Sequence, residues 1–172
     1  MKTTALLTGL ATAVLCIVYR FFPEGWLLSL IISCGTTCYH FSMRLWVGML
    51  IPSVRKDHSW FRPKKWEAPV YRLLRVKAWK KHLPTYDPQQ FSLEENTLEQ
   101  VIHNMRHAEI VHEVIMVCSF LPLLAIPAFG AWPVFLITSI LAALFDGLFV
   151  MAQRYNRPRL ERILKKQEVA AP

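Results

Sequence analysis

The fold is decided by the stretch IVHEVIMVCSFLPLLAIPAFGAWPVFLITSILAALFDGLFV, residues 110–150. A helix needs about 20 apolar residues to cross the hydrocarbon layer of a bilayer, which is about 30 Å thick. The stretch is too long for one crossing, and three prolines and Gly130 interrupt its middle, where they favour a turn. The pattern therefore predicts two membrane-spanning helices, over residues 109–128 and 132–155.

Two more apolar runs lie in the first third of the chain and predict spans over residues 4–22 and 26–51. The 172 residues are 53% hydrophobic, and the apolar ones are collected into blocks instead of alternating with polar ones. The predicted fold class is an all-α integral membrane protein with four transmembrane helices. We expect one domain over residues 1–172, with an amphipathic cytoplasmic loop at the membrane interface over residues 52–108.

The positive charge is unevenly distributed and predicts the orientation. Of the 20 Lys and Arg, ten lie in residues 55–81 and six in residues 154–166, whereas the short connections 23–25 and 128–131 contain none. Because Lys and Arg are enriched on cytoplasmic segments, we expect the long loop and the C-terminal tail in the cytoplasm. Because the number of predicted spans is even, both termini are expected on the cytoplasmic side. The pattern thus predicts a multi-pass protein with both termini in the cytoplasm.

The net charge of +8 also bears on partners. Residues 55–66, RKDHSWFRPKKW, interleave Lys and Arg with Trp60, Phe61 and Trp66, and such aromatic residues suit the headgroup region of a membrane. Residues 68–83 place apolar positions among basic ones and predict an amphipathic helix on the membrane surface. Membrane lipids, not nucleic acid, are therefore the expected partners.

A second cytoplasmic helix is predicted to begin near Ser92. This serine is a suitable N-cap, and Glu95, three residues later, completes the pattern of a capping box. The pattern stays helical up to Pro122. One continuous helix is therefore expected from the cytoplasm into the third span.

Ionisable residues within spans are costly and usually mark function, so those of the predicted spans are the candidate site residues. On each span they recur at helical spacing and share one face. The polar stripes consist of Ser33, Thr37, His40 and Arg44 in the second span, Glu109, His112 and Glu113 in the third, and Asp146, Gln153 and Arg157, with Asn156 beside them, in the fourth.

The polar stripes are expected to meet at one depth. The second span runs towards the cytoplasm, the third begins there and the fourth ends there, so their polar clusters reach the same side of the membrane. The prediction is one cavity that opens at the cytoplasmic leaflet. Its expected lining is His40, Arg44, Glu109, His112, Asn156 and Arg157.

Glu109 and His112 are the predicted catalytic residues. They lie one helical turn apart, so the carboxylate can fix the tautomer of the imidazole, as in general-base catalysis. Arg44 and Arg157 could hold a phosphate or a carboxylate, or stabilise an oxyanion, and Asn156 could donate to the same charge. A structural alternative is an ion pair between Glu109 and Arg44 that joins two helices.

A metal site is the competing interpretation. The spacing of Glu109 and His112 occurs in helical di-iron sites, but those need a second such motif and two further carboxylates, and the chain has one motif. The donors of a mononuclear zinc site would be Glu109, His112, Glu113 and His40. The sequence contains no HExxH motif. We therefore expect no metal and no bound cofactor, with zinc as the alternative.

Four short motifs resemble those of a known family. They are CYHFSMRLWVG at 38–48, VKAWKKHLP at 76–84, MRHAEIVHE at 105–113 and QRYNRPRL at 153–160. From its second predicted span onward, the chain is similar to glycosyl-4,4'-diaponeurosporenoate acyltransferases, which are small membrane proteins of bacteria. The sharpest matches are Glu109 with His112 and the sequence YNRPR at 155–159, and Lys80 belongs to a supporting match.

The resemblance implies acyl transfer. Members of this family attach a fatty acyl chain to the sugar of a C30 carotenoid glycoside in the cytoplasmic membrane. For this chain the resemblance implies a bacterial membrane acyltransferase that moves an acyl group from a thioester co-substrate to a hydroxyl of a lipid-like acceptor at the cytoplasmic leaflet. Glu113, Asp146 and Lys80 are secondary candidates for its site.

Two other functions fit the same residues. A hydrolase, either an intramembrane peptidase or a lipid hydrolase, could use Glu109 and His112 to activate water, with or without zinc. A non-enzymatic lipid-binding subunit that works in a membrane complex or oligomer is the other alternative. Bound zinc would favour the hydrolase, and transfer of a labelled acyl group would favour the transferase.

Overall fold

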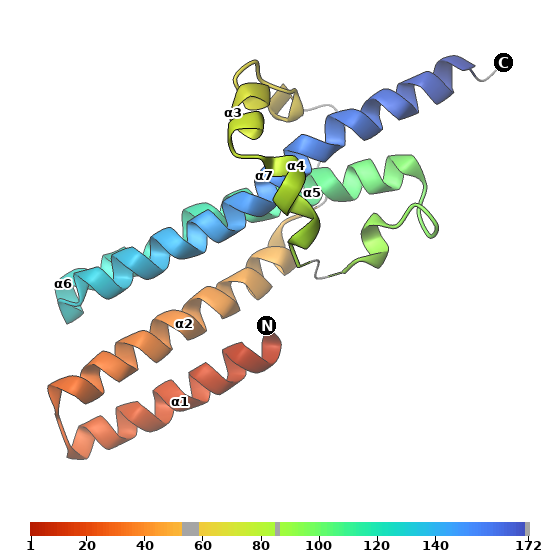
Figure 1. Cartoon of the computed structure of the whole chain (residues 1–172). Coiled ribbons are helices and arrows are strands. Elements are labelled where there is room, and N and C mark those ends of the chain that lie inside the picture. The colour runs from red at the N-terminus through yellow and green to blue at the C-terminus, as the bar shows by residue number, and fades with distance from the viewer. Residues whose placement is uncertain (53–58, 85–86, 171–172) are drawn as a thin grey trace. The chain divides into compact units, whose positions relative to one another are not determined.

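The structure is a computed structural model that describes residues 1–52, 59–84 and 87–170 (Figure 1). Within these residues every regular element is a helix, as the sequence predicts. The first residues of the predicted basic loop, 55–58, lie outside the described part.

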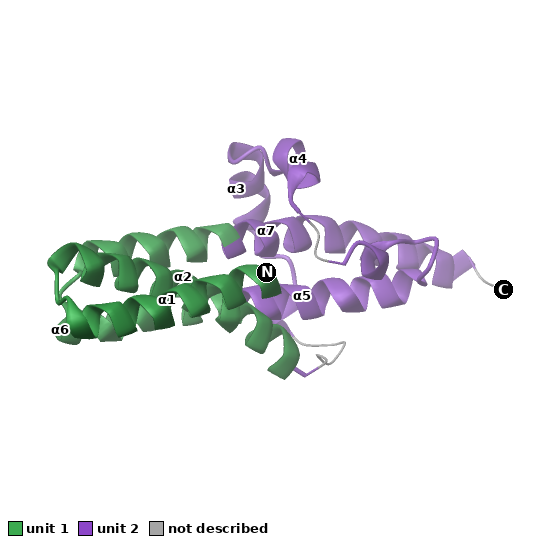
Figure 2. Ribbon diagram, turned by 90° about the horizontal axis from the view of Figure 1, so that it is seen from below, with its two compact units in different colours: residues 1–51, 114–145 green, residues 52–113, 146–172 purple. Residues whose placement is uncertain are grey.

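The chain divides into two compact units (Figure 2). Unit 1 consists of residues 1–51 and 114–145, and unit 2 consists of residues 52–113 and 146–172. The single membrane domain expected from the sequence stays a prediction.

Unit 1 begins with two long helices, α1 (Lys2–Phe21) and α2 (Gly25–Leu50), which lie side by side and antiparallel (Figure 1). Small residues allow their close approach. A Cβ atom added to Gly9 would lie 3.2 Å from the sulfur of Cys38, and one added to Gly35 would lie 3.6 Å from the Thr12 side chain. Close packing of this kind is typical of helices that associate in a membrane, where burial of apolar surface gives little driving force.

The rest of unit 1, residues 114–145, comes from the apolar stretch 110–150. The end of α5 (Leu98–Cys118) is followed by η4 (Leu121–Ala125), α6 (Ile126–Phe129) and the start of α7 (Trp132–Ala170). Gly130 closes α6 with a φ of 68°, a conformation that a residue without a Cβ adopts at low cost. The predicted turn between the third and fourth apolar segments is therefore present.

Large apolar side chains cover the outside of these helices. Leu6 is 73% exposed, Leu10 is 62% exposed and Leu144 is 62% exposed, as suits helices in contact with lipid. Among the described residues, three helical regions are long and apolar enough to cross a membrane, namely Lys2–Phe21, Leu98–Phe129 and Trp132–Ala170.

The predicted count of four spans is not confirmed. Helix α2 has 26 residues and is long enough to cross a bilayer. However, its polar stripe, which includes His40 and Arg44, lowers its hydropathy, and α2 is not among the three regions that qualify by length and composition.

Unit 2 contains the short helices of the loop, a long stretch of α5 and the C-terminal part of α7. The short helices are η1 (Ser59–Phe61), α3 (Glu67–Leu73), α4 (Val76–Trp79), η2 (Lys80–His82) and η3 (Gln89–Phe91). Its buried apolar side chains are Phe61, Tyr71, Val76, Val101, Ile102, Met105 and Ala152.

The amphipathic helix predicted over residues 68–83 is interrupted. Arg75 has a φ of 51° and separates α3 from α4. In one continuous helix, Tyr71 and Val76 would point about 140° apart, because successive residues are about 100° apart. The break allows both to be buried, with Tyr71 7% exposed and Val76 fully covered. Burial of both side chains explains why the predicted helix does not continue.

Helix α5 begins six residues after the predicted N-cap, Ser92. Its capping box is formed by Thr97 and Gln100: the backbone N–H of Thr97 donates to the Gln100 side chain at 2.8 Å, and the Gln100 N–H donates to the Thr97 hydroxyl at 3.2 Å. Asn96 instead donates to the carbonyls of Gln89 and Ser92 and holds the preceding segment as a turn.

The ends of the last two long helices also differ from the predictions. Helix α5 ends at Cys118, before Pro122, which lies at the start of η4. Helix α7 continues past the predicted end at 155 to Ala170 and contains Pro158. The segment after residue 158 is rich in Glu, Lys, Arg and Leu, which favour a helix, so the end of the apolar run does not end the helix.

Candidate functional site

His112 and Asp146 form a hydrogen-bonded pair in unit 2, one from α5 and one from α7. The distance between His112 Nδ1 and Asp146 Oδ1 is 2.8 Å. Asp146 is 1% exposed, whereas the His112 side chain is 24% exposed. Because a carboxylate accepts hydrogen bonds, the pairing assigns the proton to Nδ1 and leaves Nε2 as the basic nitrogen of the neutral ring.

Phe149 fixes the plane of the imidazole. Its ring lies parallel to that of His112, with the centroids 4.6 Å apart and 9° between the planes. Phe149 follows Asp146 by three residues on α7, so one helical face supplies both the hydrogen bond and the stacking surface. The hydrogen bond to Asp146 thus holds the edge of the His112 ring, and stacking on Phe149 holds its face.

Glu109 lies one turn before His112 and is engaged by two arginines of α7. Arg154 Nη1 donates to Oε1 at 2.6 Å, and Arg157 donates to Oε2 from Nε at 3.3 Å and from Nη2 at 3.1 Å. Glu109 is fully buried and Arg157 is 1% exposed. A buried charge needs a partner with good geometry, and these contacts provide one.

A carboxylate from the loop completes the buried ion network. Arg154 donates to Glu67 Oε1 of α3 from Nη2 at 2.6 Å and from Nε at 3.0 Å. We use the name ion network for Glu67, Glu109, Arg154 and Arg157, whose two negative and two positive charges balance. At its border, Glu161 accepts from Arg157 at 3.1 Å and from Arg106 at 2.8 Å.

Aromatic residues of the loop cover the ion network. Phe61 is buried, and its ring lies 5.2 Å from the guanidinium carbon of Arg157. The indole of Trp60 donates to Glu113 at 2.8 Å. Together with Glu67, these contacts bind η1 and α3 to α5 and α7, so the loop is an integral part of unit 2.

Lys80 and Asn156, both predicted candidates, are also brought together. The Lys80 ammonium donates to the side-chain oxygen of Asn156 and lies 4.7 Å from the centroid of the Tyr155 ring. Burial lowers the pKa of Lys80, and the positive charges of Arg159 and Lys77 lower it further. The lysine therefore lies in a local excess of positive charge.

His40 and Arg44 belong to unit 1. Arg44 donates to the backbone carbonyls of His40, at 2.9 Å, and Ala142, at 3.3 Å. His40 is buried, and its ring meets that of Tyr39 edge-on at 5.4 Å. The cavity expected between these two residues and the unit 2 candidates stays a prediction.

The pairing predicted for the catalytic residues differs from the observed one. Glu109 was expected to orient His112, but its oxygens accept from arginines, and Asp146 accepts from His112 instead. Glu109 pairs with Arg154 and Arg157 within unit 2, whereas the alternative ion pair with Arg44, which belongs to unit 1, stays a prediction. His112 pairs with Asp146 because the Asp146 carboxylate on α7 lies at the edge of the His112 ring.

The zinc alternative stays a hypothesis, because its expected donors belong to both units. In the described ranges 1–52, 59–84 and 87–170, no group of three or more His, Cys, Asp and Glu side chains is positioned to hold a metal ion. Glu109, the first of the expected donors, is occupied by the arginines.

Sequence reasoning missed three members of this region, Glu67, Arg154 and Glu161. A signal for Glu67 exists, because it is the one acidic residue between positions 58 and 86, in a strongly basic segment. Arg154 precedes Arg157 by three residues and so shares its helical face. Glu161 follows Arg157 by four residues, the spacing of a helical ion pair.

Comparison with known proteins identifies a family. The sequence model of the family described as glycosyl-4,4'-diaponeurosporenoate acyltransferase matches residues 57–166, which cover the loop, α5 and most of α7. Neither a curated protein nor a solved structure matches the chain. The matched segment contains the His112–Asp146 pair and the ion network, and it exceeds half of the chain. The chain therefore belongs to the glycosyl-4,4'-diaponeurosporenoate acyltransferase family.

Proposed function

We propose that this protein is a membrane acyltransferase that moves a fatty acyl group from a thioester to a hydroxyl of a lipid-linked acceptor, such as a carotenoid glycoside. Family membership supports acyl transfer in general. The observation that carries the proposal is the hydrogen bond between His112 and the buried Asp146, because acyl transfer to a hydroxyl needs a positioned general base.

In the proposed reaction, His112 Nε2 takes the proton of the acceptor hydroxyl as the oxygen attacks the thioester carbonyl. A C–O bond forms and the carbonyl oxygen becomes an oxyanion. Collapse of the tetrahedral intermediate breaks the C–S bond, and the leaving thiolate takes the proton back from the imidazolium. Asp146 holds the ring and stabilises its transient positive charge, which is the role of the acid in a Ser-His-Asp triad.

The ion network has a positioning role in this proposal. Glu109 lies on the same helix as His112, one turn away, and its partners Arg154 and Arg157 lie on the same helix as Asp146. Pairing across α5 and α7 fixes the register of the two helices. The network thereby keeps the imidazole within hydrogen-bonding distance of Asp146.

We further propose that α2 is a fourth span and that both termini lie in the cytoplasm. The excess of Lys and Arg in residues 55–81 and 154–166 supports this orientation. In this orientation His112, at the start of the third apolar segment, would lie at the cytoplasmic leaflet. A cytoplasmic thioester and a lipid acceptor could both reach this position.

The proposal is tested by identification of the product. The purified protein, reconstituted in lipid nanodiscs, would be supplied with an isotopically labelled fatty acyl thioester and a glycolipid with a free sugar hydroxyl, and the lipids would be analysed by mass spectrometry. We expect labelled acyl glycolipid, and none from His112→Ala. Labelled free fatty acid without acylated lipid would overturn the proposal in favour of a hydrolase.

A further inference from the structure

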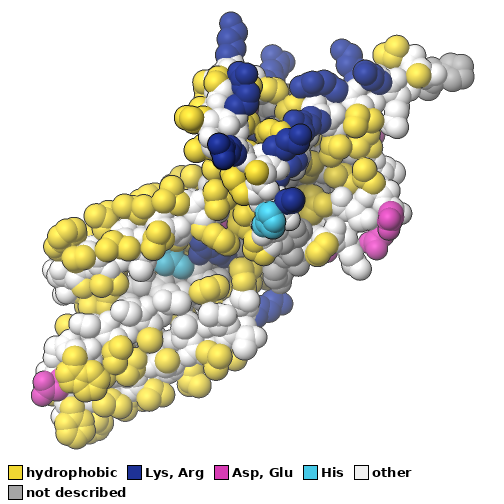
Figure 3. Space-filling view, viewed as in Figure 1, with side chains coloured by type: hydrophobic (Ala, Val, Ile, Leu, Met, Phe, Trp, Pro, Cys, Tyr) yellow, Lys and Arg dark blue, Asp and Glu magenta, His cyan; other side chains and the backbone are white. Residues whose placement is uncertain are grey.

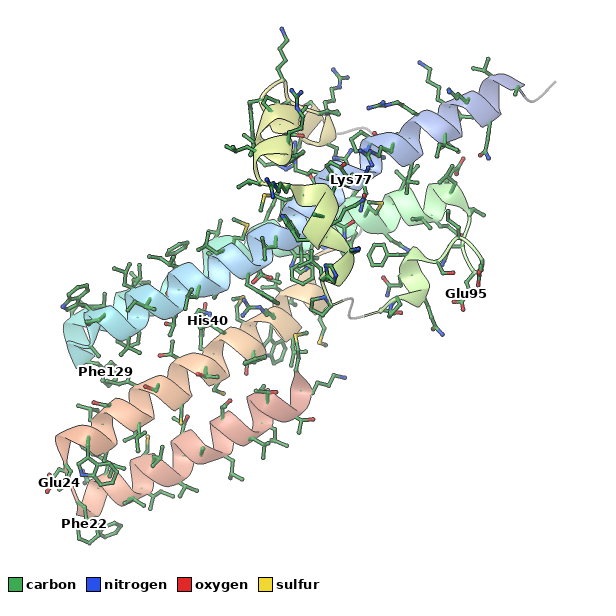
Figure 4. All side chains as sticks on the ribbon, viewed as in Figure 1. Phe22, Glu24, His40, Lys77, Glu95 and Phe129 are labelled. Atoms are coloured by element: carbon green, nitrogen blue, oxygen red, sulfur yellow. The ribbon has the colours of Figure 1, made fainter. Side chains whose placement is uncertain are left out.

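A basic groove is open on the surface of unit 2, apart from the His112–Asp146 pair. Its volume is about 700 Å³, within the range of about 300–1,000 Å³ of small-molecule sites. It is lined by four cations and two aromatic rings, namely Arg72, Arg75, Lys77, Lys81, Tyr71 and Tyr155. Figure 3 shows Lys and Arg gathered over this part of the molecule, and Figure 4 labels Lys77 on α4.

The break at Arg75 creates the groove. Its left-handed backbone turns the chain between α3 and α4, so that the cations before and after it surround one space. The base is formed by Tyr71, which is buried, and Tyr155 of α7, whose rings meet edge-on at 6.1 Å. A non-glycine residue in this conformation costs free energy, and such residues are often found at binding sites.

The cations of the groove have no carboxylate partner in the part of the chain that the structure describes. Within the described residues, no carboxylate bonds to any of the four lining cations, since the nearby Glu67 and Glu109 are occupied by Arg154 and Arg157. Lys80 and Arg159, which lie 4.7 Å and 4.2 Å from the Tyr155 ring centroid, add two more cations at the border. A concave surface with one sign of charge attracts ligands of the opposite sign.

We propose that the basic groove binds the phosphate groups of the acyl donor, a coenzyme A thioester. This inference rests on the proposed function, which requires a thioester. Coenzyme A carries its phosphates at one end and its sulfur at the other, joined by the flexible pantetheine arm. Tyr155 lies nine residues after Asp146 on α7, about 14 Å along the helix and about 180° around it. The flexible pantetheine arm of a donor whose phosphates bind in the groove would therefore pass around α7 to bring the thioester to His112.

Direct binding tests the proposal without catalysis. Coenzyme A would be titrated by calorimetry into the full-length protein in detergent. The native protein would be compared with the double variant Arg72→Ala/Lys81→Ala and with the control Lys165→Ala/Lys166→Ala. The control removes the same charge from exposed positions at the end of α7. We expect the first variant to raise the dissociation constant at least about tenfold, since a charge-assisted hydrogen bond contributes about that factor. The control should bind like the native protein.

The outcomes separate this inference from the proposed function. Equal weakening by both variants, or weakening by neither, would overturn the groove as the coenzyme A site even if acyl transfer is observed. If dihexanoylphosphatidylglycerol bound to the groove and coenzyme A did not, the groove would be a site for anionic lipid. This result would also overturn the inference. Groove-dependent binding that persists in His112→Ala supports the inference, and it would do so even if the native protein transferred no acyl group.

Discussion

The substitution Glu109→Gln separates a positioning role of Glu109 from a catalytic one. It removes one charge from the ion network while it keeps nearly the same side-chain volume. The remaining buried charges, Glu67 with Arg154 and Arg157, are no longer balanced. Among the described residues, the carboxylate that Arg157 keeps is Glu161 on its own helix, whose side chain is 29% exposed. Loss of one partner from a buried ion pair costs about 3–5 kcal/mol.

The expected loss is large compared with the whole stability of a protein, which is about 5–15 kcal/mol. For a chain of this size, about 1 kcal/mol shifts the melting temperature by about 2–4 °C, so Glu109→Gln should lower it by about 6–20 °C. Circular dichroism of the detergent-solubilised protein measures this shift. The matched control is Glu161→Gln at the partly exposed border of the network, which should cost about 1 kcal/mol.

Activity measured per folded protein completes the comparison. If Glu109 positions the helices, the Glu109→Gln protein that remains folded below its melting temperature should lose less of its transfer rate than the about 10²–10⁴-fold expected for loss of the general base. A variant with native melting temperature and no activity would refute this reasoning and would return Glu109 to the catalytic role first inferred from the sequence.

Three further predictions concern the fold. Thr97→Ala removes the observed cap of α5 and should lower the free energy of unfolding by about 1 kcal/mol, whereas Ser92→Ala should cost less. Gly9→Leu should disturb the close packing of α1 on α2 and cost about 1–3 kcal/mol, whereas Gly48→Leu, in open space, should melt like the native protein. Burial and the charge of Glu67 raise the pKa of Tyr71 from 10.0 to about 12, so its contribution to stability is present below about pH 10 and is lost as the pH rises towards 12. Tyr71→Phe should therefore reduce alkaline destabilisation between these values, and an unchanged alkaline unfolding curve would contradict the assignment.

The long helices could be predicted from the sequence because their apolar length is a local property. The first span was predicted over 4–22, and α1 covers Lys2–Phe21; the second was predicted over 26–51, and α2 covers Gly25–Leu50. The end of α7 could not be placed in this way, because a polar helix can continue an apolar one. Loss of hydropathy marks the end of a span and not the end of a helix.

Two capping-box motifs compete for the start of α5, and tertiary contacts determine which of them forms. Both Ser92 with Glu95 and Thr97 with Gln100 match the capping-box pattern. The hydrogen bonds of Asn96 to the turn before it favour the second. These bonds depend on the folded path of the η3 segment, which periodicity does not reveal.

The candidate site was predicted in part. Polar residues at the start of an apolar run identified His112 and Glu109, and the stripe of the fourth span identified Asp146 and Arg157. Their pairing could not be predicted, because the partners lie 34 to 48 residues apart and neighbours on one helix were the nearest candidates. Helical spacing shows which residues share a face, whereas the facing helix decides which of them meet.

The central claim is that His112 acts as a base held by Asp146, and a double-mutant cycle on the rate of acyl transfer tests it most directly. The native protein, His112→Ala, Asp146→Asn and the double variant would be compared in nanodiscs, at equal amounts of folded protein. Loss of a general base lowers rates by about 10²–10⁴-fold, and residues that act as a unit give strongly non-additive losses. The account predicts that the double variant is no slower than His112→Ala alone. Losses that multiply, or a native rate in His112→Ala, would contradict it.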